Sequence, residues 1–241
     1  MEHHSDIAIG AEIIDDKYTE DILRRRYSNF KASYLVDKEL KTMGLNIRHQ
    51  NTPEDITENI TKFIILNYEK DSTCVWCKGV DPKHKMTGDL YSSRYDKSTP
   101  IEVKSFTSDG PSQFGPDKKF GVLYFLDLRQ WLDDKIVLWK VSINHTSSEF
   151  LNIQVNKKQT MAEQLKEGRR PHIGWNKLYP QISSFCEKIF EGTFEDIFAS
   201  QPVAHHANNS TILLAINETT GTETALPANE YNLDADRGGS W

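Results

Sequence analysis

The chain lacks a long apolar run. Hydrophobic residues make up 37% of its 241 positions, yet no stretch approaches the ~20 apolar residues needed to cross a bilayer. The first residues, Met1 to Asp6, also lack the basic start and apolar core of a secretory signal. These absences argue against a membrane protein and against export, and we expect a soluble, cytoplasmic protein.

Cysteine is scarce, with residues only at 74, 77 and 186. Such a sparse, odd-numbered set fits a reducing compartment and argues against a disulfide framework. Cys74 and Cys77 have the spacing of half a zinc site, with His84 nearby, but no second cysteine pair follows. We therefore favour buried thiols over a metal site.

Positive charge is in deficit, because 35 acidic residues face 29 basic ones and give a net charge of −6. This balance argues against nucleic-acid binding, since phosphate contacts need Lys and Arg. The acid is concentrated at the two ends, however. Residues 1–21 sum to −6 and residues 197–241 to −4, which leaves +4 for residues 22–196. Local patches therefore decide whether this chain can bind nucleic acid.

The length suits one domain that buries its own core. We expect a flexible acidic N-terminus over 1–15, a single domain over 16–200, and an acidic, low-complexity tail or peripheral extension over 201–241. Apolar spacing predicts helices at 16–44 and from Pro53 to about residue 70, and again at 159–167 and 179–198. Between them, β-like runs occur at 73–77, 87–92, 100–107, 120–127 and 135–143.

The most informative residues lie in two of these β-like runs. Asp89 stands in the first, and the triplet Glu102-Val103-Lys104 follows in the next. Strand alternation places Glu102 and Lys104 on one face. A turn over 93–99 would bring Asp89 beside Glu102 on an adjacent antiparallel strand.

Two carboxylates at this spacing suit Mg²⁺, which takes one or two carboxylates and keeps several waters. The backbone carbonyl of Val103 offers a further ligand. With a lysine beside them, Asp89 and Glu102 match the active-site residues of a metal-dependent phosphodiesterase.

The residues at these positions resemble a known family, the PD-(D/E)xK nuclease superfamily, and type II restriction endonucleases in particular. The resemblance spans roughly residues 50–185 and rests on 86–92, 102–106, 110–116, 123–127 and 169–173. One departure is Gly88, which stands where the superfamily's name has a proline.

The resemblance implies a restriction-endonuclease-like α/β (α+β) fold, with a central mixed β-sheet flanked by helices. It also implies a homodimer that hydrolyses duplex DNA at a short specific sequence and leaves 5′-phosphates, with a cognate DNA methyltransferase as functional partner. Asp89 and Glu102 would hold Mg²⁺, and Lys104 would polarise or orient the attacking water. Such enzymes often add an acid from an N-terminal helix, for which Glu58 is the first candidate and Glu54 the second.

DNA contacts are predicted at two places. Lys157, Lys158, Arg169 and Arg170 form either a phosphate-binding patch or a solvated helix face. The segment 108–116, with Ser112 and Gln113, is either an ordinary loop or one that approaches DNA. The aromatic residues at 131, 139, 175 and 179 are expected in the core.

Two other functions remain open from the sequence. The same chemistry would serve a structure-specific repair or recombination nuclease, which cuts branched or damaged DNA. An acid-x-lysine on a strand is also found on solvated surfaces, so a non-catalytic DNA-binding module is the third alternative.

Overall fold

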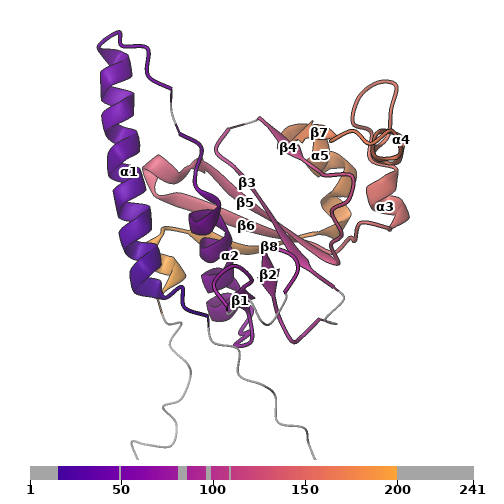
Figure 1. Ribbon diagram of the computed structural model, residues 1–241, viewed down its shortest axis with the longest axis horizontal. Helices are drawn as coiled ribbons and strands as arrows, with labels where there is room; N and C mark the ends of the chain where they lie inside the picture. The colour runs from indigo at the N-terminus through magenta and orange to yellow at the C-terminus, as the bar shows by residue number, and fades with distance from the viewer. Residues whose placement is uncertain (1–15, 49, 81–85, 96–98, 109, 200–241) are drawn as a thin grey trace, which may run out of the picture. The chain divides into compact units, whose positions relative to one another are not determined.

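The structure is a computed structural model that describes residues 16–199 apart from 49, 81–85, 96–98 and 109 (Figure 1). The segments predicted as flexible at 1–15 and as a tail at 201–241, together with His84, lie outside the described residues. In the part of the chain that is described, no helix is both long enough and apolar enough to span a membrane.

Two helices precede the sheet, as the sequence predicts. Helix α1 spans Glu20–Thr42 and begins where the Thr19 hydroxyl accepts the Ile22 N–H, with acids in its first turn facing the positive end of the helix dipole. Helix α2 spans Glu54–Tyr68 and starts directly after Pro53, whose fixed φ suits a helix start. Both predicted helices are confirmed.

A mixed six-stranded sheet forms the centre, in the order β1-β2-β3-β5-β6-β8. Strands β3 and β5 pair in parallel, while every other neighbouring pair in this sheet is antiparallel. The strands predicted in the middle of the chain are confirmed, and so is the fold class. The bounds are β1 Val75–Trp76, β2 Leu90–Tyr91, β3 Ile101–Phe106, β5 Val122–Gln130, β6 Lys135–Val141 and β8 Cys186–Gly192.

Helices cover both faces of this sheet (Figure 1). On one face, α1 and α2 pack against alternate residues of β3 and β5, among them Ile101, Val103 and Tyr124. On the other face, Phe106 and Phe125 pack against the later helices. Strand β5 is buried on both faces, which its nearly continuous apolar sequence predicts for a central strand. The middle of the sheet is therefore covered on both faces.

Most of the remaining short elements lie on the second face, whereas η2 and η4 pack with α1 and α2 on the first. A two-stranded antiparallel sheet pairs β4 with β7, so that the predicted loop at 108–116 contains a strand. The predicted helix at 159–167 is confirmed as α4. The elements are β4 Pro111–Gln113, η2 Trp131–Asp133, α3 Ser148–Leu151, α4 Met161–Lys166, β7 His172–Gly174, α5 Trp175–Ile182, η3 Ser183–Phe185 and η4 Glu195–Ile197.

The helix predicted over 179–198 is wrong. Helix α5 ends at Ile182, and residues 186–192 form β8, the edge strand that pairs with β6. Apolar residues at three-to-four-residue spacing suggested a helix, but Phe190 instead packs under the α1 and α2 face. Pairing with the free edge of β6 therefore overrides the local periodicity.

The prediction of buried thiols holds for Cys74, whereas Cys77 is only half-buried; both are free thiols. Burial raises the pKa of the Cys77 thiol to about 12, which makes it a poor nucleophile and metal ligand. The large aromatic residues lie in the cores, as predicted. Trp131 and Trp175 are buried in the two cores, and Trp139 and Tyr179 pack against Trp175.

Candidate active site

The backbone of Gly88 and Asp89 lies directly against the start of strand β3. The Asp89 N–H donates to the Ile101 carbonyl at 2.9 Å, at the start of the antiparallel pairing of β2 with β3. The preceding Gly88 has φ +97° and lies so close to Pro100 that a Cβ would stand 2.8 Å from the proline Cβ. Proline, with φ near −65°, cannot adopt this conformation, so the fold explains the departure noted in the sequence.

Glu102 and Lys104 project from the same face of β3, as alternation predicts. Lys104 Nζ donates to Glu102 Oε1 at 2.6 Å. One oxygen of Asp89, Oδ2, accepts the Val103 N–H at 2.8 Å. The predicted juxtaposition of Asp89, Glu102 and Lys104 is therefore present in the structure, with both carboxylates buried.

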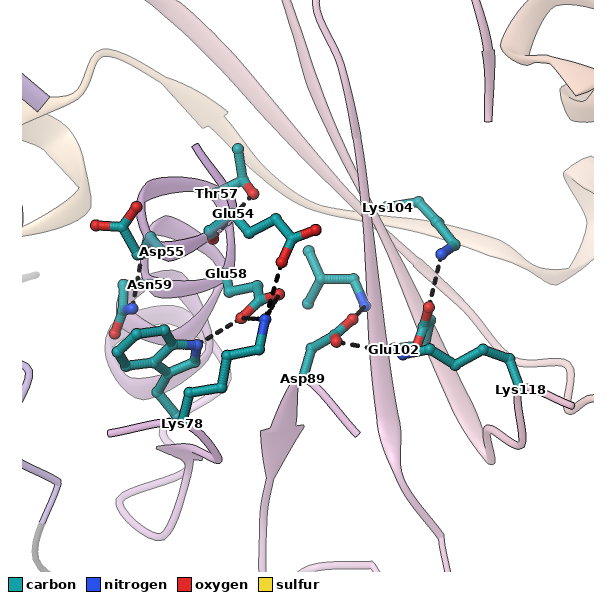
Figure 2. A network of polar contacts seen from close by, with 12 residues as sticks. Glu54, Asp55, Thr57, Glu58, Asn59, Lys78, Asp89, Glu102, Lys104 and Lys118 are labelled. Atoms are coloured by element: carbon teal, nitrogen blue, oxygen red, sulfur yellow. Dashed lines mark hydrogen bonds and ion pairs between the residues drawn. The ribbon is translucent and has the colours of Figure 1, made fainter. Parts of the chain in front are cut away.

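A second lysine, Lys118, contacts both carboxylates. It lies on the connection between β4 and β5, and its Nζ is 2.7 Å from Glu102 Oε2 and 3.5 Å from Asp89 Oδ1. The two carboxylates thus turn one oxygen each toward a single cation (Figure 2). No pattern in the sequence predicts a role for Lys118, because it lies in a connection that has no regular secondary structure and hence no periodic spacing.

The two carboxylates differ in electrostatics. Burial raises the pKa of Asp89, and the neighbouring charge of Glu102 raises it further. Burial alone would also raise the pKa of Glu102, but Lys104 and Lys118 outweigh burial and lower it. Glu102 is therefore a permanent anion at neutral pH, whereas Asp89 gains most from an added cation.

Glu58 faces the same cavity from α2. Its carboxylate accepts the Trp76 indole N–H and lies 2.9 Å from Lys78 Nζ. Burial raises the pKa of Glu58; the Trp76 hydrogen bond opposes this rise, and the charge of Asp89 adds to it. Of the two predicted candidates on this helix, Glu58 is buried and Glu54 is exposed, although both contact Lys78.

These side chains line one open cavity. Figure 2 shows the α2 group and the β3 group facing each other across Asp89. The cavity also takes in Val103 and the predicted DNA-contacting residues Ser112 and Gln113 of β4. Residues from α2, β3, β4 and the connections before β2 and before β5 therefore meet at one place.

The donor set fits a hard divalent cation. Within the described residues, no group of three or more His, Cys, Asp or Glu side chains is arranged to hold a metal ion. Mg²⁺ does not require three, because it uses one or two carboxylates and completes its shell with water and substrate phosphate. Asp89 Oδ1 and Glu102 Oε2 already converge on the ammonium group of Lys118.

The predicted basic patch lies outside the cavity at Asp89. Lys157, Lys158, Arg169 and Arg170 are all exposed. Arg169 is ion-paired with Glu167 at 3.0 Å. Arg170 stands just before β7, and the intervening Pro171 accepts the Phe114 N–H, so this arginine approaches the β4 segment. These four basic residues do not line the cavity at Asp89.

Comparison with known proteins decides the family. The family model of the Bsp6I restriction endonuclease matches residues 14–179. The chain belongs to the Bsp6I restriction endonuclease family. It is therefore a restriction endonuclease, an enzyme that cuts DNA at specific sites, and the predicted membership of the type II restriction endonucleases is confirmed.

A curated relative agrees with this family. The chain is 29% identical over 152 residues to the type II restriction enzyme Bsp6I of Bacillus sp. (strain RFL6), which covers 62% of this chain and 78% of the relative. No solved structure matches the chain. The segment matched by the family model contains every cavity residue described above as well as Arg169 and Arg170.

Proposed function

We propose that the cavity at Asp89 is the active site of a Mg²⁺-dependent type II restriction endonuclease that cuts duplex DNA and leaves 5′-phosphate ends. The observation that carries this proposal is the meeting of Asp89, Glu102 and Lys104 where β2 begins to pair with β3, within the segment that the family model matches. Asp89 and Glu102, with the Val103 carbonyl, would hold the ion.

When bound, the ion would supply Lewis-acid chemistry for phosphodiester hydrolysis, and the protein's own residues would divide the remaining work. Glu102 fixes the ammonium of Lys104 at 2.6 Å, which places a positive charge beside the phosphate. Lys104 orients the attacking water and offsets the negative charge that develops on phosphorus. The Val103 N–H fixes the rotamer of Asp89, so that its other oxygen stays turned into the cavity.

Glu58 serves as an additional acid in this proposal. Because its pKa is raised, Glu58 is protonated more readily than an ordinary glutamate. Its contacts with Trp76 and Lys78 fix its position. A group of this kind is suited to proton transfer through water at the cavity wall. Glu54 would act only through Lys78, which it contacts at 3.0 Å.

DNA would be held by residues that line the cavity and by basic residues outside it. Ser112 and Gln113 line the cavity, and in this proposal they would contact the strand that is cut. Lys157, Lys158, Arg169 and Arg170 would contact phosphates farther along the duplex. Cutting both strands of a symmetric site favours a homodimer, and light scattering in solution should then give twice the chain mass of 27.7 kDa.

Sequencing the ends of cleaved DNA tests the proposal. A long duplex incubated with the protein and Mg²⁺ should give discrete fragments whose 5′-phosphorylated ends share one short sequence, and chelator should abolish them. Methylation by a cognate methyltransferase should protect that sequence. Ends without a common sequence, or cutting only at branches, would instead support the repair nuclease, and no cleavage of any duplex would support a binding module.

A further inference from the structure

Lys118 holds the two carboxylate oxygens that are left for a metal ion. The β3 strand already engages the other oxygen of each group, since Asp89 Oδ2 accepts the Val103 N–H and Glu102 Oε1 accepts Lys104. The remaining oxygens, Asp89 Oδ1 and Glu102 Oε2, both face Lys118 Nζ. A bound ion would need these same two atoms.

The Lys118 side chain is more exposed than that of Lys104, so it has more room to change position. Lys104 stands on the central strand with only 19% of its side chain exposed, whereas the Lys118 side chain is 47% exposed. Lys118 lies in a turn, where its N–H donates to the Gly115 carbonyl at 3.2 Å. A lysine on such a connection can withdraw its ammonium by rotating its four-carbon stem, without disturbing the sheet.

We propose that the Lys118 ammonium occupies the metal-ion site of the free enzyme. It leaves this site when the divalent ion binds, and it then pairs with a DNA phosphate at the rim of the cavity. This inference rests on the proposed role of Asp89 and Glu102 as metal ligands. It deepens that role by assigning one further residue, which both weakens metal binding without DNA and strengthens binding of the substrate.

The charges of the group support this sequence of events. The charged residues that line the cavity, Glu54, Glu58, Lys78, Asp89, Glu102, Lys104 and Lys118, are four acids and three lysines and sum to −1, so the free site does not attract a phosphodiester. Adding a divalent ion while keeping the lysines nearby gives +1. The site then accepts a phosphate anion, and the displaced Lys118 is the cation free to contact it.

Calorimetric titration with Mn²⁺ tests the displacement. Lys118→Met should bind Mn²⁺ in the absence of DNA about tenfold more tightly than the wild-type protein, which corresponds to ~1.4 kcal/mol. Lys119→Met is the matched control, because it removes an exposed positive charge from the neighbouring position and should leave the affinity within about twofold. Equal or weaker Mn²⁺ binding by Lys118→Met would overturn the inference.

Two further readouts separate the possible failures. The ¹H–¹⁵N signal of the Lys118 ammonium, assigned by its loss in Lys118→Met, should shift when Mg²⁺ is added, and an unchanged signal at saturation would refute displacement. In steady-state cleavage, Lys118→Met should raise KM several-fold more than it lowers kcat. If wild-type and Lys118→Met proteins both fail to bind Mn²⁺, or if Asp89→Asn binds it as tightly as wild type, the proposed metal site itself is wrong, and the inference falls with it.

Discussion

At the scale of single residues, the proposed catalytic role of Asp89 predicts that its carboxylate lowers the stability of the fold. It is buried beside another carboxylate, and its pKa is raised by burial and by the charge of Glu102. A residue selected only for folding would not carry an ionised group in such a position. The third alternative from the sequence, in which these acids serve folding alone, therefore makes an opposite prediction about stability.

Asp89→Asn should raise the melting temperature of the metal-free protein while lowering cleavage by at least about a hundredfold. The folded-state pKa of Asp89 lies above the unfolded value of about 3.9, so ionising Asp89 costs stability once the pH exceeds that value. The gain in the variant should grow as pH rises from about 4 through the raised folded-state pKa of Asp89, and then level off.

Melting curves in chelator across this pH range, with cleavage assays at neutral pH, would measure both effects. The exposed Asp117 in the connection before β5 supplies the control, since Asp117→Asn should change neither quantity. A lower melting temperature in Asp89→Asn would show that the carboxylate stabilises the fold.

Gly88 positions Asp89, and its replacement should be costly. Gly88→Ala puts a Cβ at positive φ and 2.8 Å from Pro100, which we expect to destabilise the protein by about 2–4 kcal/mol. Gly168→Ala is the matched control, because Gly168 also has positive φ (+70°) but nothing within 4 Å of the added Cβ. It should cost only about 1 kcal/mol. Urea denaturation of both variants would measure the difference, and equal losses would show that the Pro100 contact is unimportant.

At the scale of elements, strands with strong local patterns were predictable, and the edge strand was not. The run at 101–106 alternates and lies among other β-like runs, so β3 and its Glu102–Lys104 face follow from period alone. Residues 186–192 carry a helical spacing, and only the free edge of β6 makes them a strand. Pairing with a distant segment leaves no trace in a single sequence.

The same division applies to the candidate site. Asp89 directly precedes β2, and Glu102 and Lys104 lie on β3, which pairs with β2, so the arrangement is local. Lys118 and Trp76 reach the site from connections and from another strand. Their contacts depend on tertiary packing, so no spacing along the chain predicts them.

Helix α2 is held in place by a buried ion pair. Lys62 on this helix donates to Asp16 Oδ2 and to the Tyr18 carbonyl, both at 2.7 Å, and is only 3% exposed. Asp16 also accepts the Trp76 N–H from β1. This network joins α2 to β1 and so fixes the distance between Glu58 and the Trp76 indole.

Lys62→Met should therefore destabilise the protein by about 3–5 kcal/mol, since it leaves a buried carboxylate without its cation. Lys188→Met, which breaks an exposed pair with Glu191, should cost less than about 1 kcal/mol. Chemical denaturation would compare the two. Similar small losses in both variants would show that the buried pair contributes little to anchoring α2.

At the scale of the whole molecule, the negative net charge does not prevent DNA binding because the acids are unevenly distributed. Residues 22–196 carry +4, whereas the chain as a whole carries −6. The exposed basic residues near α4 and β7 belong to this positive central part. Binding should therefore depend on local cations and hence on salt.

Replacing Lys157 and Lys158 with alanine should lower the salt dependence of duplex binding. Removing one lysine–phosphate interaction reduces the slope of log K against log salt by about 0.9, so we expect a reduction of about 1–2 if both lysines bind DNA. The exposed Lys38 and Lys41 at the end of α1 supply a control pair. Fluorescence anisotropy at several salt concentrations would measure the slope, and an equal reduction in the control pair would argue against a specific patch.

We infer that Glu102 and Asp89 make this protein a metal-dependent DNA-cutting enzyme. Cleavage of a long duplex by wild-type and Glu102→Gln proteins in Mg²⁺ tests this claim most directly, with Glu149→Gln, at an exposed position of α3, as control. Wild type and control should give the same discrete fragments, and Glu102→Gln should give none while still binding the duplex. Full cleavage by Glu102→Gln would contradict the claim.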